Sequence, residues 1–152
     1  MKSRHRAREI ALQMLYQYDL VSNGTPKPVL PESELASELM RHYDHFRVDA
    51  ELREFIGQLV AGTLTHISVL DELLEKHASH WKVARMSAVD RSILRLAAYE
   101  MVFLKEVAPS IVIDEAIELS KGYGTSESSA FINGILDGIL SAVKNLPPLL
   151  PL

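Results

Sequence analysis

Basic side chains gather at the very start of the chain, and such a cluster can bind an anion. The cluster consists of Lys2, Arg4, His5, Arg6 and Arg8. If Ser3 caps a helix there, each cation in its first turn lies at the positive end of the helix dipole, at a cost of about 0.3–1 kcal/mol. Backbone N–H groups, the dipole and the arginine side chains would all favour a phosphate at this end. A frayed, solvated terminus fits the same residues, so both interpretations stay open.

Arg6 and Arg8 fall on opposite flanks of a helical wheel, so the sequence predicts no continuous basic stripe. Groups that could stack on bases or hydrogen-bond to them follow in the same stretch: Gln13, Tyr16, Gln17 and Tyr18. The whole chain has a formal net charge of -4. This charge argues against a protein that covers nucleic acid with its entire surface, but it permits a local basic patch.

Composition excludes several classes of site. The chain has 152 residues, 47% of them hydrophobic, which suits one domain with a buried core. Cysteine is absent, and this excludes disulfides, thiolate metal sites and a cysteine nucleophile. No apolar run approaches the roughly 18 residues of a membrane span. We therefore expect a soluble, cytoplasmic protein.

The elements that position the basic cluster are predicted to be helices, because apolar residues recur at spacings of three and four. The first helix should end at the glycine and prolines of residues 22–31. A second is expected from about Pro31, where proline is tolerated in a first turn. A third should begin after an N-cap at Asp49 and break near residues 65–68.

The second half of the chain continues this pattern. Ser87 and Asp90 resemble a capping box at the start of a helix over residues 88–106. "APS" at residues 108–110 separates it from a helix that starts near Val112 and should stop at the "GYG" of residues 122–124. A last helix should follow Thr125 and end at Pro147 and Pro148.

No stretch alternates with period two, so the predicted fold is all-α, with about six or seven helices. We expect a single domain, residues 1–152, built from two small packed bundles. Their expected bounds are residues 1–80 and 81–146, followed by a loose tail at 147–152. The tail sequence "PPLLPL" could also be a proline-helix ligand, which is the less favoured interpretation.

Small residues recur at every fourth position in the last predicted helix: Ala130, Gly134, Gly138 and Ala142. Glycine costs a helix interior about 1 kcal/mol relative to alanine, so close approach of another helix is the expected compensation. Asn133 and Asp137 could instead present polar groups at the surface.

The sequence contains no catalytic constellation. His42 with His45, and His77 with His80, have the spacing of metal ligands but no obvious third ligand, so surface histidines are favoured. The carboxylates of "DEAIE" at residues 114–118 are expected to form a solvated acidic face, since no partner for acid–base catalysis is evident. We expect no enzyme activity, no metal and no cofactor.

Three blocks of the sequence resemble the NusB family of bacterial transcription antitermination factors. They are "RAREIALQMLYQYDL", "VDRSILRLAAYEM" and "IDEAIELSKGYGTSESSAFINGILDGI", and they occur in the order found in that family. The resemblance implies an all-helical, non-enzymatic protein that binds boxA elements of ribosomal RNA leader transcripts together with the ribosomal protein NusE. It also implies a part in the RNA polymerase complex that reads through terminators.

The resemblance also implies two sets of site residues. The RNA-binding set is Lys2, Arg4, His5, Arg6, Arg8, Phe131, Glu127, Ser128 and Ser129. The family often has a lysine before the phenylalanine, where this chain has Ala130, so one phosphate contact is missing or supplied elsewhere. The partner-binding set, facing NusE, is Asp90, Arg91, Tyr99 and Glu100, of which several could instead hold the two bundles together.

Two other functions fit the resemblance. Similar domains are attached to ribosomal RNA cytosine methyltransferases as RNA-binding appendages, so the chain could be a fragment of such an enzyme. It could also be a helical module whose main contact is another protein, either NusE or a second copy of itself in a homodimer.

Overall fold

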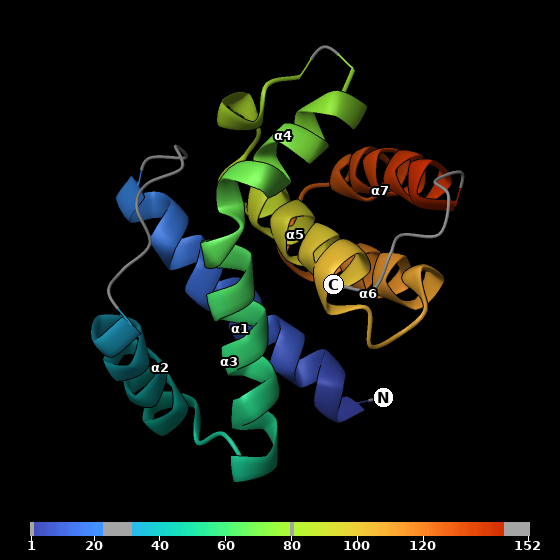
Figure 1. Cartoon of the computed structure of the whole chain (residues 1–152). Helices are drawn as coiled ribbons and strands as arrows, with labels where there is room; N and C mark the ends of the chain where they lie inside the picture. Colours follow the sequence, from blue (N-terminus) through green and yellow to red (C-terminus); the bar gives the residue numbers. More distant parts are fainter. Residues whose placement is uncertain (1, 23–31, 80, 145–152) are drawn as a thin grey trace.

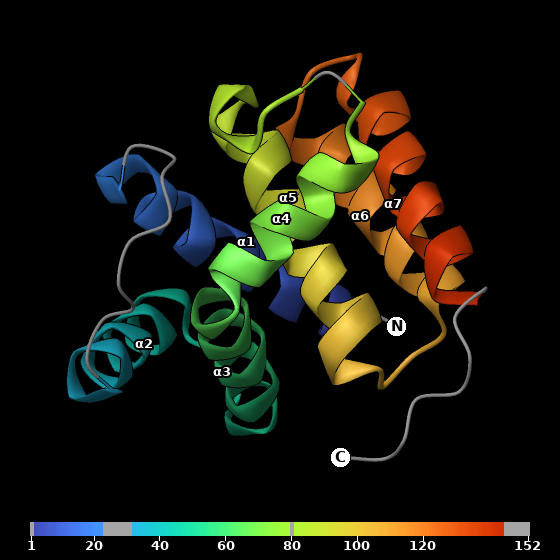
Figure 2. The ribbon, with the colours of Figure 1, turned by 45° about the horizontal axis from the view of Figure 1, so that its top comes forward.

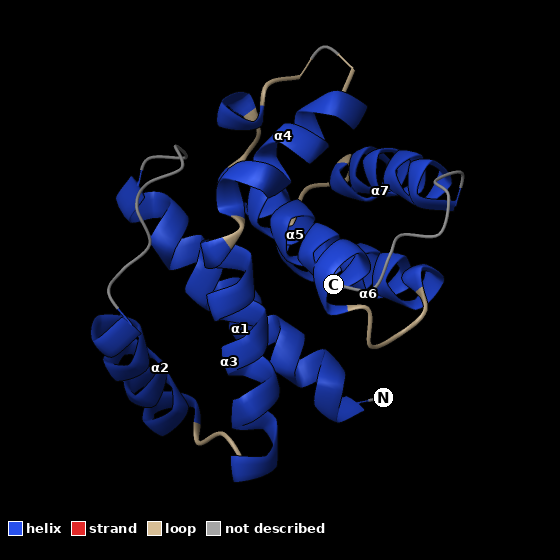
Figure 3. Ribbon diagram, in the orientation of Figure 1, coloured by secondary structure: helices blue, strands red, loops and turns tan. Residues whose placement is uncertain are grey.

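The computed structural model describes residues 2–22, 32–79 and 81–144. Over these ranges the chain is all-α, as predicted, without a strand (Figure 3). The elements are α1 Lys2–Ser22, α2 Glu32–Phe46, α3 Ala50–Thr65, α4 Ile67–His77, the 3₁₀ turn η1 Val83–Arg85, α5 Ala88–Tyr99, the π-helical turn η2 Glu100–Leu104, α6 Pro109–Tyr123 and α7 Ser128–Lys144. None of the described helices is both long and apolar enough to cross a membrane.

Helix α5 is the centre of the fold, and it packs against α1, α3, α4, α6 and α7 (Figure 1). Helix α1 also packs along α3, while α6 and α7 lie side by side (Figure 2). Helix α2 contacts α3 at the edge of the molecule. Helix α4 precedes the expected boundary near residue 80, yet it packs on α5 and α7, so one hydrophobic core continues across that boundary.

Several predicted helix ends are confirmed. Ser87 is the N-cap of α5, and its Oγ accepts a hydrogen bond from the backbone N–H of Asp90 at 3.1 Å. Asp49 precedes α3, although its side chain makes no capping hydrogen bond. The expected break between the third and fourth helices falls at His66.

Other predicted ends are wrong. Helix α1 begins at Lys2, so Ser3 lies inside the helix and does not cap it. Helix α6 begins at Pro109, three residues before the predicted start, because proline fits the first turn of a helix. In contrast, the stop predicted at the "GYG" of residues 122–124 is confirmed, because α6 ends at Tyr123 and Gly124 is its C-cap, while Gly122 is still helical. The loop was expected over residues 22–31, but Ser22 is still the last residue of α1. The rest of that loop and the expected tail at 147–152 lie outside the described residues.

The predicted close-packing face of α7 is wrong at three of its four positions. Only Gly138 approaches another helix, where an added Cβ would come within 3.1 Å of His77 Nδ1 on α4. An added Cβ at Gly134 would meet nothing within 4 Å, and Ala130 and Ala142 are exposed. The same side of the helix carries the exposed Asn133 and Asp137, so the alternative of a polar surface is confirmed.

A glycine that the sequence did not single out is required for packing. Gly62 lies in α3 opposite Tyr99, and a Cβ at this position would overlap the phenol ring. The ring of Tyr99 is stacked with those of His66 and Phe103. Gly62 therefore lets the end of α5 lie directly against α3.

We predict opposite effects on stability for alanine at the two glycines. Gly62→Ala should lower the free energy of unfolding by about 1–3 kcal/mol, because the new methyl group displaces Tyr99. Gly134→Ala should raise it by up to about 1 kcal/mol, since alanine favours the helix and the methyl group meets no neighbour. Urea denaturation measures both, and equal effects of the two substitutions would contradict this account of α3 and α5.

Candidate nucleic-acid interface

The start of α1 lies beside the segment that leads from η2 into α6 (Figures 1 and 2), and acidic side chains of this region contact the basic cluster. Arg4 Nη1 is 3.1 Å from Glu106 Oε2, and its guanidinium carbon lies 4.2 Å from the ring centroid of Phe55. His5 Nδ1 is 2.7 Å from Glu115 Oε2. These two basic side chains remain partly exposed.

Arg8 differs from its neighbours because it is buried, with 3% of its surface exposed. Its Nε and Nη2 donate to the two carboxylate oxygens of Glu100 at 2.8 and 2.9 Å. Its Nη1 lies 4.0 Å from Glu115 Oε1. Two parallel hydrogen bonds of this kind are strong and directional, so Arg8 joins α1 to the first residue of η2.

Arg6 is the most exposed of the described cations in the cluster. About half of its side chain, 49%, is exposed, and its Nη1 is 3.8 Å from Glu9 Oε1 one turn along α1. Lys2 begins the helix, and its side chain lies outside the described part of the chain. Of the five predicted cluster residues, the structure therefore places Arg4, His5 and Arg6 at the surface and Arg8 inside.

The predicted acidic face of "DEAIE" is only partly solvated. Asp114 and Glu118 are exposed, as expected. Glu115 turns toward α1, where it pairs with His5. Among the described residues, no group of three or more histidine, aspartate or glutamate side chains could hold a metal ion.

The residues predicted at the start of α7 divide in the same way. Ser128 is buried, and its Oγ accepts the backbone N–H of Thr125 at 3.0 Å, while Ser129 Oγ lies 2.7 Å from Ser120 Oγ. Both serines therefore shape the turn before α7. Glu127 is exposed and Phe131 is half-buried.

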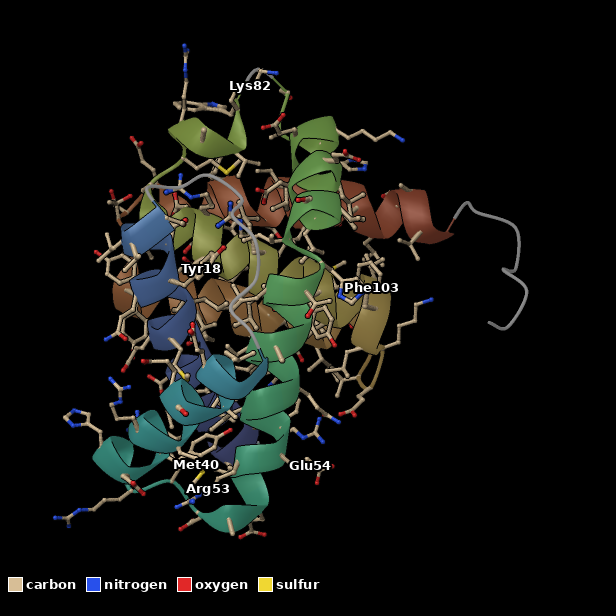
Figure 4. The ribbon with its side chains drawn as sticks, turned by 60° about the vertical axis from the view of Figure 1, so that its left-hand side comes forward. Tyr18, Met40, Arg53, Glu54, Lys82 and Phe103 are labelled. Carbon is tan, nitrogen blue, oxygen red and sulfur yellow. The ribbon has the colours of Figure 1, made fainter. Side chains whose placement is uncertain are left out.

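Phe131 has an aromatic neighbour that the sequence reasoning missed. Trp81 meets it edge to face, with ring centroids 6.0 Å apart and planes at 76°. Trp81 is 54% exposed, and two exposed cations follow it in the chain, namely Lys82, which Figure 4 labels, and Arg85. The sequence does contain a signal for this aromatic site, because the only tryptophan of the chain is followed closely by these two cations.

Three of the four predicted partner-binding residues are buried. Glu100 pairs with Arg8, and Tyr99 stacks with His66. Burial raises the pKa of Tyr99, and the nearby charge of Glu106 raises it further. Asp90 is half-buried, and its Oδ1 accepts no hydrogen bond in the described part of the chain.

Arg91 is the third buried residue of this set, and it belongs to a buried network of charges. It donates to both oxygens of Asp19 at 2.8 and 2.6 Å and to the carbonyl oxygens of Val83 and Met86. Arg95 bonds to Asp19 at 3.0 Å and to both oxygens of Asp71 at 2.7 and 2.8 Å. The pKa of Asp71 lies above its ordinary value, because the effect of burial is larger than the opposing effect of the hydrogen bonds and charge of Arg95.

An open groove of about 460 Å³ runs beside the second half of α1. The Tyr123 hydroxyl at the end of α6 donates to Glu9 Oε2 at 3.0 Å and accepts from Gln13 Nε2 at 3.3 Å, which holds one wall over α1. The lining residues are Leu12, Gln13, Tyr16, Gln17, Leu20, Val89 and Tyr123. Three of the four groups that the sequence suggested for base contacts therefore lie in this groove.

The burial of Arg8 generates a prediction about stability. Arg8→Ala leaves the buried carboxylate of Glu100 without its partner and should lower the free energy of unfolding by about 3–5 kcal/mol. Arg6→Ala removes an exposed cation and should change it by less than about 0.5 kcal/mol. Chemical denaturation of both variants checks this, and equal small effects would contradict a structural role for Arg8.

Comparisons with known proteins match the chain to one family. The model of the NusB family matches residues 5–141. A relative named transcription antitermination protein NusB, from Desulfitobacterium hafniense, is 43% identical over 142 residues, covering 93% of this chain and 90% of its own. Another of that name, from Nitratiruptor, is 39% identical over 145 residues, covering 95% and 96%.

Solved structures agree with this match. NusB from T. maritima is 31% identical, covers 91% of this chain and 90% of its own, and superposes with a TM-score of 0.74. A crystal structure of the antitermination factors NusB and NusE in complex with dsRNA contains a chain that is 29% identical. That match covers 93% of this chain and 98% of the other, with a TM-score of 0.77. The chain belongs to the NusB family.

Proposed function

We propose that this protein is a non-catalytic RNA-binding subunit in transcription antitermination. In this role it binds boxA-type RNA of ribosomal RNA leader transcripts together with NusE, and it helps RNA polymerase in the cytoplasm to read through terminators. The names of its relatives and the solved complex of NusB, NusE and dsRNA support this role. The observation on this chain that carries it is the surface group of Arg4, His5 and Arg6 at the start of α1, of which Arg6 is the most exposed.

These three side chains suit a phosphate backbone better than a single small anion. They follow one another along the first two turns of α1, where the helix dipole adds positive potential. Arginine can bind phosphate through two parallel hydrogen bonds. Arg8 contributes by holding the helix in place, because its own guanidinium is occupied by Glu100. The side chains of Phe131 and Trp81 offer aromatic surface to an unpaired base.

Binding through phosphates should depend steeply on salt. Each phosphate contact with a single strand contributes a slope of about 0.7 in log K against log salt, so Arg4→Ala with Arg6→Ala should flatten the slope by about 1 to 1.5. A suitable control is Arg41→Ala with Arg47→Ala, which removes the same charge from exposed positions within α2 and directly after it. Titration of boxA-type RNA at several salt concentrations measures the slopes. A slope unchanged by the first pair would remove these arginines from the RNA site.

We infer that NusE contacts the groove and the adjoining Asp90. The groove has an apolar lining from Leu12, Leu20 and Val89, which suits an apolar side chain of a protein partner better than the charged sugar-phosphate backbone of RNA. Asp90 follows Val89 directly and has a buried carboxylate oxygen that lacks a donor among the described residues. The residue as a whole is only half-buried, so a partner bound in the groove can reach it. The predicted contacts through Arg91, Tyr99 and Glu100 would be indirect, through the packing of α5.

Two neighbouring residues allow a matched test of this groove. Leu20 lines it and is 57% exposed, while Val21 is 88% exposed and is not part of the lining. Leu20→Glu should weaken NusE binding by about tenfold, the loss of a moderate interface contact. Val21→Glu should leave it within about twofold. Calorimetric titration with NusE checks both, and equal affinities for the two variants would place NusE elsewhere.

A further inference from the structure

The partly exposed basic side chains of α1 already have acidic side chains beside them. Glu106, between η2 and α6, contacts Arg4 at 3.1 Å, and Glu115, on α6, contacts His5 at 2.7 Å. Both carboxylates come from parts of the chain more than 100 residues from their partners, so they are brought to α1 by the tertiary fold. The unfavourable placement of cations at a helix N-terminus is thus compensated within the folded protein.

A phosphate and a carboxylate use the same chemistry to bind these side chains. Both present negatively charged acceptor oxygens to guanidinium and imidazole N–H donors. An RNA phosphate that binds Arg4 must therefore displace Glu106 or approach it closely, and two anions at that distance repel each other. The same holds for His5 and Glu115.

The ion pairs differ in how easily they can open. The Arg4 and Glu106 side chains are 34% and 38% exposed, and exposed pairs of this kind are weak. The Arg8 and Glu100 side chains are each 4% exposed, and breaking a buried pair is costly because each charge is left without a partner and without water to solvate it. The structure thus combines a permanent inner pair with outer pairs that can exchange their anion.

We propose that Glu106 and Glu115 are intramolecular competitors of the RNA phosphate backbone. They hold Arg4 and His5 in the absence of RNA and lower the affinity for any RNA that makes only a few phosphate contacts. An RNA held at further points, by the aromatic pair or by a bound partner, can displace them. This proposal rests on the proposed RNA-binding function and concerns the regulation of the same site.

The test compares two glutamates that differ in their partners. Glu106→Gln removes the competitor of Arg4 and should tighten binding of boxA-type RNA by about two- to fivefold at low salt, the range expected for one exposed pair. Glu118→Gln is the control, because Glu118 is exposed on α6 and pairs with Lys121 at 3.4 Å. It removes the same charge without freeing a cation of α1. Glu115→Gln, which frees His5, should also tighten binding.

A second background separates competition from a general change in charge. If Glu106 acts by occupying Arg4, Glu106→Gln should gain nothing over its parent when Arg4→Ala is already present. A gain of the same size in both backgrounds, or a gain no larger than that of Glu118→Gln, would overturn the competition. In either case the wild-type protein still binds RNA, and the proposed function stands. Absence of RNA binding by the wild-type protein, with and without NusE, would overturn the proposed function and the competition together.

Discussion

The fold depends on a network of four buried charges that joins three helices. Asp19 of α1, Arg91 and Arg95 of α5, and Asp71 of α4 contact one another at 2.6 to 3.0 Å with almost no exposure to solvent. Removing any one of them would leave a buried charge unpaired, so the network disfavours arrangements of these helices that separate the partners. Arg91 also binds two backbone carbonyl oxygens around η1, which fixes the turn that leads into α5. The direction of α1 across α5 follows from these contacts, and that direction brings its first turns to η2 and α6.

Helix α1, which carries the basic cluster, is therefore anchored at both of its ends. Asp19 anchors the C-terminal part of the helix, and Arg8 anchors the N-terminal part through Glu100. Cations of one short stretch thus have two different tasks. Arg8 is buried and stabilises the fold through its pair with Glu100, while Arg4 and Arg6 remain at the surface, where an RNA can reach them. In our account the acidic side chains around them keep this surface neutral until a ligand with several phosphates replaces them.

The sequence was sufficient to predict the helices and much less of their surroundings. Apolar spacing located α1 to α7, and local chemistry located the cap at Ser87 and the break at His66, because both depend on neighbouring residues. Burial of Arg8 could not be predicted, since its partner Glu100 lies 92 residues away. The same applies to Arg91, whose partner Asp19 is 72 residues away. Helical spacing defines which residues share a face, but it does not say what that face meets, and for this reason the small residues of α7 were assigned a neighbour that only Gly138 has.

The most direct test of the central claim is a binding titration with two RNAs and two protein states. A boxA-containing RNA and a scrambled RNA of the same length and composition are each titrated against the protein, with NusE present and absent. Our account predicts the tightest binding for boxA RNA with NusE, because phosphate contacts act on any sequence while base contacts and the partner add selectivity. Equal weak binding in all four titrations would contradict it and would leave the exposed cations of α1 without a role in RNA recognition.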